Sequence, residues 1–203
     1  MHIWGHFKTI TRHRHMVMKL CFKAGLYRQG LAHDLSKYSI TEFSKGIRYY
    51  QGVRSPNNYE REVTGISLSW LHHKGRNKHH FEYWLDYDIK DPGRMTGMLM
   101  PRKYVAEMFC DRIAACRVYE KDAYTPASPA RFFYRSSGRF MMNDVTRREL
   151  GYLLTMLSVK GVDESLRYVK HEFLKGTEIP DDYVECENLR DFDERYEAGE
   201  LGI

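Results

Sequence analysis

Residues 102–121, RKYVAEMFCDRIAACRVYEK, decide the fold class of this chain. The apolar residues Val105, Phe109 and Ile113 recur every four positions, which is the spacing of one face of an α-helix. Pro101 stands just before this segment, where the first turn of a helix tolerates proline. The segment therefore predicts a long amphipathic helix.

Helical periodicity continues on both sides of this segment. Ser39 and Glu42 have the spacing of a capping box at the start of one further helix. Because alternating strand patterns are absent, we predict an all-α protein. Helices are expected over residues 9–26, 39–50, 59–73, 144–159 and 163–173, with a short helix containing HDLSK at 33–37. Loops are expected at 51–58, at Pro92-Gly93 and around 126–129.

The domain organisation is expected to be simple. We assign residues 1–177 to one helical domain and residues 178–203 to an acidic tail, which we expect to be helical and to pack on that domain or extend from it. The hydrophobic share of 42% is enough to form a core. No apolar run approaches the ~20 residues that span a bilayer, and the N-terminus lacks the apolar segment of a signal peptide. We therefore expect a cytoplasmic protein with no membrane partner. The sequence does not determine its oligomeric state.

Charge is unevenly distributed along the chain. The formal net charge is +5, yet residues 178–200 hold ten acidic and two basic residues, which leaves 30 basic against 17 acidic residues elsewhere. A basic body favours a phosphate-bearing partner, either a nucleotide or another small molecule, with nucleic acid also possible. The alternative is a surface that is simply rich in Lys and Arg.

Histidines gather in the first 80 residues, which hold nine of the ten. Seven of them fall in three clusters, at 13–15, at 33 and at 72–80. Imidazole is the commonest protein ligand of metal ions and titrates near neutral pH. A single buried histidine is usually structural, but three clusters near carboxylates favour a metal site.

The most informative run is AHDLSK at 32–37. His13 and His15 lie upstream on a predicted helix, and Asp111 lies 77 residues after Asp34 on another. This order of an upstream His, a His-Asp doublet and a distant helical Asp resembles the HD-domain superfamily of metal-dependent phosphohydrolases. The resemblance covers about residues 8–122.

The resemblance implies a helical bundle in which His13, His33, Asp34 and Asp111 bind a divalent ion. Imidazole and carboxylate donors suit Mn, Fe, Co, Ni or Zn, and Mg less well, and a carboxylate can bridge two ions. A bound ion lowers the pKa of its water and stabilises negative charge on a phosphoryl oxygen. We therefore assign Asp34 a catalytic role as well as a metal-binding one.

Three basic residues are candidates for phosphate contacts. HDLSK resembles the HDxGK variant of the same superfamily, in which Lys37 would contact a substrate phosphate, so we assign Lys37 a catalytic and substrate-binding role. A solvent-exposed lysine near a helix end is the alternative. We also assign substrate-binding roles to Arg76 and Lys78, which lie between two histidine pairs.

The segment WLHHKGRNKHHFE at 70–82 supplies candidate ligands for a second ion. Some HD enzymes hold a second ion with two additional histidines between the doublet and the last Asp. One member of each pair would serve here, and we select His73 and His80 over His72 and His79. The alternative is that one member of each pair packs or caps while the other faces solvent.

Two ligand choices depend on neighbouring residues. Glu107 and Asp111 are four positions apart on the 102–121 helix, and we expect Glu107 at the surface and Asp111 as the ligand.

A second resemblance is to an uncharacterised family of small proteins in bacteria and their phages, and it rests on the runs HRHMVMK, HDLSK, HHKGRNKHH and EMFCDRIAA. This family supplies no activity. Its pattern favours His13 as the first ligand, with His15 second.

The sequence therefore predicts a metal-dependent phosphohydrolase that acts on a nucleotide or other phosphate ester through water activated by one or two divalent ions. One alternative is a non-catalytic helical metal-containing module that binds a partner such as nucleic acid. A metal-dependent nuclease of the HNH type is less favoured, because the β-hairpin of such sites has no signal here.

Overall fold

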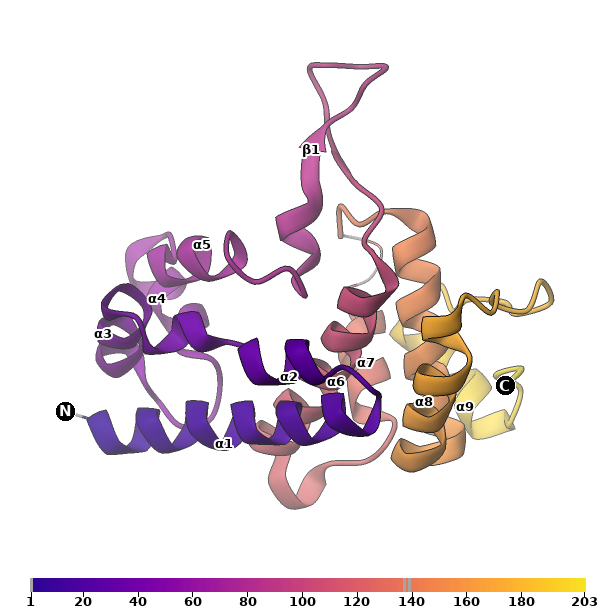
Figure 1. Ribbon diagram of the computed structural model, residues 1–203, viewed down its shortest axis with the longest axis horizontal. Helices are drawn as coiled ribbons and strands as arrows, with labels where there is room; N and C mark the ends of the chain where they lie inside the picture. The colour runs from indigo at the N-terminus through magenta and orange to yellow at the C-terminus, as the bar shows by residue number, and fades with distance from the viewer. Residues whose placement is uncertain (1, 137, 139) are drawn as a thin grey trace.

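Helices form nearly all the regular structure of the computed structural model, which describes residues 2–136, 138 and 140–203 (Figure 1). The predicted all-α class is confirmed. In chain order the elements are α1 Ile3–Lys23, α2 Tyr27–Ala32, η1 Leu35–Tyr38, α3 Ile40–Tyr49, α4 Pro56–Thr64, α5 Leu68–Lys74, η2 Phe81–Trp84, β1 Leu85–Tyr87, β2 Met95–Gly97, α6 Arg102–Glu120, η3 Lys121–Ala123, α7 Ser128–Tyr134, α8 Asp144–His171, η5 Phe173–Lys175 and α9 Leu189–Ala198.

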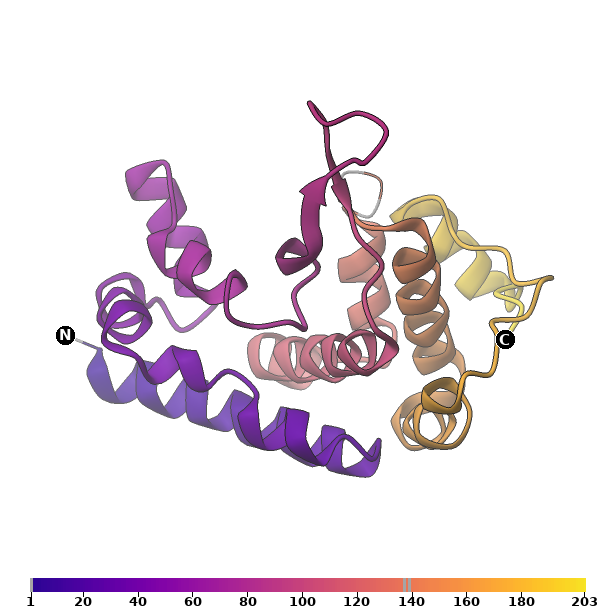
Figure 2. The same ribbon diagram turned by 45° about the horizontal axis from the view of Figure 1, so that its top comes forward.

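Helix α6 is the centre of the core. It packs against α1 on one side and α8 on the other, and Val105, Phe109 and Ile113 have no exposed surface. Figure 2 shows α1, in indigo, along the lower left side of the body, with α2 beside it. Because α6 is covered on several sides, its polar residues at the α1 side face the protein interior. This burial positions the candidate site.

Several expected elements differ from the observed ones, and the loop expected around 126–129 contains the start of α7 at Ser128. The segment 59–73 forms two helices, α4 and α5, because Gly65 ends α4 with φ +77° and Ser67 starts α5 by accepting a hydrogen bond from the Trp70 amide. The His-Asp doublet is not helical: α2 ends at Ala32 and η1 begins at Leu35. The expected helix over HDLSK is therefore wrong for its first two residues.

The segment around Pro92-Gly93 is the tip of a small hairpin. Strands β1 and β2 pair antiparallel, with Leu85 opposite Gly97, and the hairpin projects from the helical body (Figure 1). Each strand has three residues, which is too short to give an alternating pattern in the sequence. The expected helices 144–159 and 163–173 form one helix, α8, which is interrupted at Gly161, where φ is 78°.

The acidic segment 178–203 contains α9, which packs on α7. Phe192 is fully buried and stacks between Tyr134 and Tyr196, at ring-centroid distances of 5.3 and 5.8 Å. Arg131 of α7 donates a 2.7 Å hydrogen bond to Asp193. Within the described part of the chain, no helix has the length and apolar character needed to cross a membrane.

Candidate metal centre

A sharp turn at the His-Asp doublet places two consecutive side chains in the interior. Asp34 has left-handed backbone angles, φ 55° and ψ 23°, which cost a non-glycine residue about 1 kcal/mol. Arg14 of α1 stabilises the turn by donating to the carbonyl oxygens of His33 and Leu31, at 3.1 and 2.5 Å. His33 and Asp34 are each 1% exposed.

Four residues from three segments form the first group of metal-ligand type. His13 Nε2 lies 2.9 Å from Asp111 Oδ1, and His33 Nε2 lies 3.3 Å from Asp34 Oδ2. His33 Nε2 is also 3.5 Å from Asp111 Oδ1. One ligand atom of each residue lies within 4.8 Å of the other three. The structure thus brings together the quartet selected from the sequence, whereas His15 is exposed on the other side of α1.

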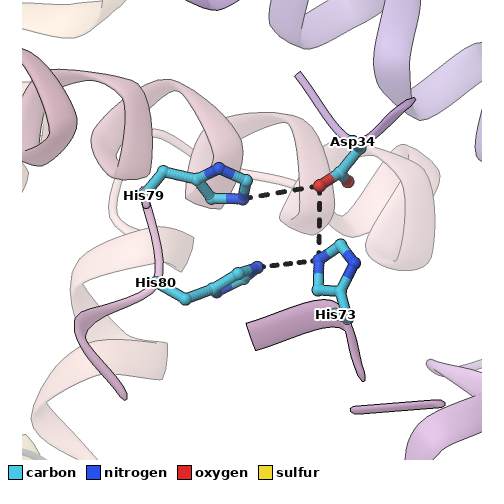
Figure 3. Close-up of side chains that lie close together, drawn as sticks. All are labelled: Asp34, His73, His79 and His80. Atoms are coloured by element: carbon cyan, nitrogen blue, oxygen red, sulfur yellow. Dashed lines mark hydrogen bonds and ion pairs between the residues drawn. The ribbon is translucent and has the colours of Figure 1, made fainter. Parts of the chain in front are cut away.

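A second group meets the other oxygen of the same carboxylate. Figure 3 shows His73, His79 and His80 around Asp34. Asp34 Oδ1 lies 3.3 Å from His73 Nε2 and 3.5 Å from His79 Nε2, and the Nε2 atoms of His73 and His80 are 2.9 Å apart (Figure 3). His73 and His80 were selected from the sequence, and His79 is an addition. His72 lies outside the group.

Asp34 is common to both groups through different atoms. Its Oδ2 faces His33 and His13, at 3.3 and 3.6 Å, and its Oδ1 faces His73 and His79. A carboxylate placed in this way can bridge two ions.

Glu107 is buried, so the expectation of a surface position was wrong. It is 5% exposed, and its Oε1 accepts a 2.9 Å hydrogen bond from His33 Nδ1 and lies 3.1 Å from His79 Nδ1. The cause is the location of α6 between α1 and the 75–84 segment, which leaves this face without solvent. An acceptor on Nδ1 holds the proton of that nitrogen, so Nε2 is the nitrogen that would bind an ion after losing its own proton.

Glu42 has the same relation to the second group. Its carboxylate accepts hydrogen bonds from His73 Nδ1 at 2.8 Å and from His72 Nδ1 at 2.7 Å. Ser39 Oγ accepts a hydrogen bond from the Glu42 amide, as the capping pattern predicted, but the Glu42 side chain serves the histidines instead. The sequence pattern therefore indicated Glu42 as a capping residue, whereas in the structure its carboxylate binds the two histidines.

Lys37 contacts the shared carboxylate directly. Its Nζ donates a 2.5 Å hydrogen bond to Asp34 Oδ2, from a side chain that is 28% exposed. Burial would lower the pKa of Lys37, but the carboxylates of Asp34 and Asp111 outweigh it and raise the pKa above its usual value. The ammonium group is therefore charged, and it lies between the buried carboxylate of Asp34 and solvent.

The other two candidate phosphate-binding residues lie on the exposed side of the loop. Arg76 donates to the His72 carbonyl at 3.4 Å, and Lys78 Nζ lies 5.6 Å from the ring centroid of Tyr83. Their contacts are thus with backbone and an aromatic ring rather than with the His and Asp groups. Asn77 between them is buried and holds the loop.

Electrostatics divide the site into charged and neutral groups. Burial would raise the pKa of Asp34, but the neighbouring His33, Lys37 and His73 hold it well below its ordinary value. The His33 pKa is correspondingly raised against the effect of burial, chiefly by Asp34. Burial and the adjacent His79 lower the pKa of His80 well below its usual value, so its ring is neutral. A neutral imidazole is the form that binds metal.

Within the described residues, four buried atoms of the two groups lie 2.9–3.5 Å from a neighbouring polar atom but form no well-directed hydrogen bond: His13 Nε2, His33 Nε2, His79 Nε2 and Asp34 Oδ1. Buried polar atoms in folded proteins nearly always have a partner, so an unsatisfied set that converges on one place needs an explanation. These nitrogen and oxygen donors are the atoms that divalent transition metals bind. The residues present therefore fit one or more ions, and the buried clusters could hold them.

A comparison with protein-family models gives one match, to a family described as "Family of unknown function (DUF5662)", over residues 2–156. The chain belongs to this family. The matched region runs from α1 into α8 and contains every residue of both groups. No curated protein and no solved structure matches the chain.

Sequence reasoning missed three residues of the site: Glu42, His79 and Glu107. The spacing of Glu107 and Asp111 was the available signal, because two acids on one helix face repel each other unless cations lie near. His33, whose pKa is raised, is such a neighbour of both acids.

Proposed function

We propose that the protein is a metal-dependent phosphohydrolase that hydrolyses a phosphate ester or nucleotide, with divalent ions on both sides of Asp34. The observation that supports this most is the set of buried nitrogen and oxygen atoms around that carboxylate that form no well-directed hydrogen bond among the described residues. Ions bound in both groups would satisfy all four of these atoms at once.

The two groups differ in the ions they suit. The first combines two imidazoles with two carboxylates, a set compatible with Mn, Fe, Co or Ni. The second has three imidazoles and one carboxylate, which favours Zn, Co or Ni. Mg is the least suited, because it prefers oxygen ligands.

Ions at these positions would supply water of lowered pKa and a Lewis acid for the phosphoryl group. The protein supplies the rest. Glu107 and Glu42 orient the imidazoles through Nδ1, and Asp34 stays ionised because its surroundings lower its pKa. The Lys37 ammonium group, partly exposed beside Asp34, is placed to neutralise charge on the phosphoryl oxygens of a substrate.

The first test is metal content, measured by elemental analysis of protein purified without chelator. We expect close to two equivalents of transition ion. Asp34→Ala should lose both ions, His13→Ala only the first and His80→Ala only the second. His15→Ala, an exposed histidine on the same helix as His13, is the matched control and should keep both. Full metal content in Asp34→Ala would disprove the assignment.

The second test is turnover. A panel of nucleotides, cyclic nucleotides, oligonucleotides and aryl phosphates is assayed with Mn, Co, Ni, Zn and Mg in turn. Metal-dependent product that disappears in Asp34→Ala supports the proposal. Activity that survives in Asp34→Ala would end it, and bound metal without any product would favour the non-catalytic binding module.

A further inference from the structure

The first part of the chain carries no acidic residue. Residues 1–33 contain neither Asp nor Glu, although the whole chain has 27 of them, and hold six Lys and Arg. This segment forms α1 and α2, which lie side by side along one flank of the body (Figures 1 and 2). The flank therefore has a positive charge of its own, separate from the net charge of the chain.

Part of this charge is organised along one face of α1. Six exposed residues follow one another at intervals of three or four positions, which places them on one line along the helix. An aromatic ring stands at each end, with Trp4 73% and Phe22 37% exposed. We call this set the outer stripe of α1: Trp4, Lys8, Arg12, His15, Lys19 and Phe22.

The stripe is not neutralised by the rest of the protein. Within the described residues, Lys8, Arg12 and Lys19 form no ion pair, whereas Lys23 nearby pairs with Asp163 at 2.8 Å. Side chains on this face line a shallow open depression of about 530 Å³: Phe7, Lys8, Thr11, Arg12, His15, Met16 and Lys19. The cations and an apolar floor are thus available together.

We propose that the outer stripe of α1 binds single-stranded nucleic acid. Lys8 and Arg12 are about one helical turn apart and Lys19 is about two turns further, so the three cations lie in a row that can contact successive phosphates of one strand. The exposed rings of Trp4 and Phe22 offer surfaces on which unpaired bases stack. Basic side chains flanked by exposed aromatic rings supply the charge and the stacking surfaces that sequence-tolerant single-strand binding uses.

An anionic membrane is the other partner that a basic helix with aromatic residues suggests. Such a helix must insert an apolar face between the lipids. In α1 that face is already used, because Ile10, Val17 and Leu20 are buried in the core against the rest of the protein. On the outer stripe, Lys8, Arg12, His15 and Lys19 separate Trp4 from Phe22, so the two rings do not form one continuous apolar face. These features favour nucleic acid.

The stripe is separate from the metal centre. His13 faces the centre from the buried side of α1, while His15 belongs to the exposed stripe. Binding along the stripe therefore needs no ion in the centre and does not rest on the proposed hydrolase activity. For this reason, all binding tests are run in EDTA.

The probe is a fluorescein-labelled 15-residue oligothymidylate, titrated with the full chain and followed by anisotropy. With three phosphate contacts, affinity should fall with log salt at a slope of about −2, or about 20-fold between 50 and 200 mM salt. The same strand in a duplex should bind more weakly, because its bases are not free to stack. No binding at 50 mM salt, or equal affinity for the duplex, would overturn the proposal.

Variants test the location. Lys8→Glu/Arg12→Glu/Lys19→Glu should abolish binding, while the control Lys90→Glu/Lys160→Glu/Lys175→Glu, with the same charge change at other exposed sites, should reduce it far less. Equal losses would show a net-charge effect only and overturn the proposal.

Trp4→Ala should weaken binding about tenfold with an unchanged salt slope, whereas Tyr87→Ala on the hairpin should leave the affinity unchanged.

Two other measurements exclude competing partners. Tighter binding to vesicles rich in phosphatidylserine would show that the stripe is a membrane surface. Self-association in sedimentation that the triple charge variant abolishes would show instead that a second copy of this chain occupies it.

Discussion

Replacing Glu107 should weaken the binding of both ions at once. One oxygen of Glu107 accepts from His33 Nδ1 and lies 3.1 Å from His79 Nδ1. His33 is a residue of the first group and His79 of the second, and Glu107 joins the two through their Nδ1 atoms. Glu107→Gln keeps an acceptor oxygen but removes its charge, whereas Glu107→Ala removes the acceptor entirely. Both imidazoles become weaker ligands in either variant.

The size of the effect follows from these contacts. Loss of an outer partner of a ligating histidine costs about 10–100-fold in metal affinity. We therefore expect Glu107→Gln to raise the dissociation constant of each ion about tenfold, and Glu107→Ala about a hundredfold, equivalent to ~1.4 and ~2.7 kcal/mol. Glu42→Gln should weaken the second ion alone, because Glu42 contacts His73 and no residue of the first group.

The assay measures each site separately. Competition with a chromogenic chelator in the His80→Ala background reports the first ion, and in the His13→Ala background the second. Glu120→Gln, an exposed residue on the same helix α6, controls for changes in the helix itself. If Glu107→Gln changes the affinity of only one ion, or behaves like Glu120→Gln, the bridging role of Glu107 is refuted.

Three further predictions concern other parts of the molecule. In the proposed hydrolase, Lys37→Ala should lower kcat/KM at least tenfold without loss of bound ion, because the ammonium group would neutralise substrate charge and is not a ligand. Steady-state kinetics and elemental analysis measure the two effects, and reduced metal content would contradict this. Burial, helped by the charge of Lys37, lowers the pKa of His6 to about 4, so the unfolded chain takes up a proton first as pH falls below 6.5. His6 should therefore contribute a loss of roughly 1–2 kcal/mol in the free energy of unfolding of the chelated protein between pH 7 and pH 5, after allowance for solvent screening. Urea unfolding should show that His6→Asn lacks this contribution, and the same pH dependence in both proteins would contradict it. In urea unfolding, Phe192→Ala should lower the free energy of unfolding by about 3–5 kcal/mol, whereas Val184→Ala, at an exposed position, should hardly change it. Equal effects of the two variants would mean that α9 does not pack on α7.

The helices that sequence reasoning located well are those with a strong local signal. The apolar positions of α6 and the Ser39 cap of α3 depend on neighbours within four residues, and both are present in the structure. The division of 59–73 at Gly65 and the β1–β2 hairpin were missed. A single left-handed glycine and strands of three residues leave little periodic pattern to detect.

The sequence by itself determined the all-α class and which residue types are available for a metal centre, since helical periodicity and the His and Asp positions are local properties. Only the tertiary structure decided how they meet. The left-handed turn at Asp34 directs its two oxygens to different groups, and the packing of α1 against α6 brings His13 to Asp111 across almost a hundred residues. Burial of α6 also turned Glu107 from an expected surface acid into the contact shared by His33 and His79. These outcomes depend on contacts between distant segments, which no local pattern encodes.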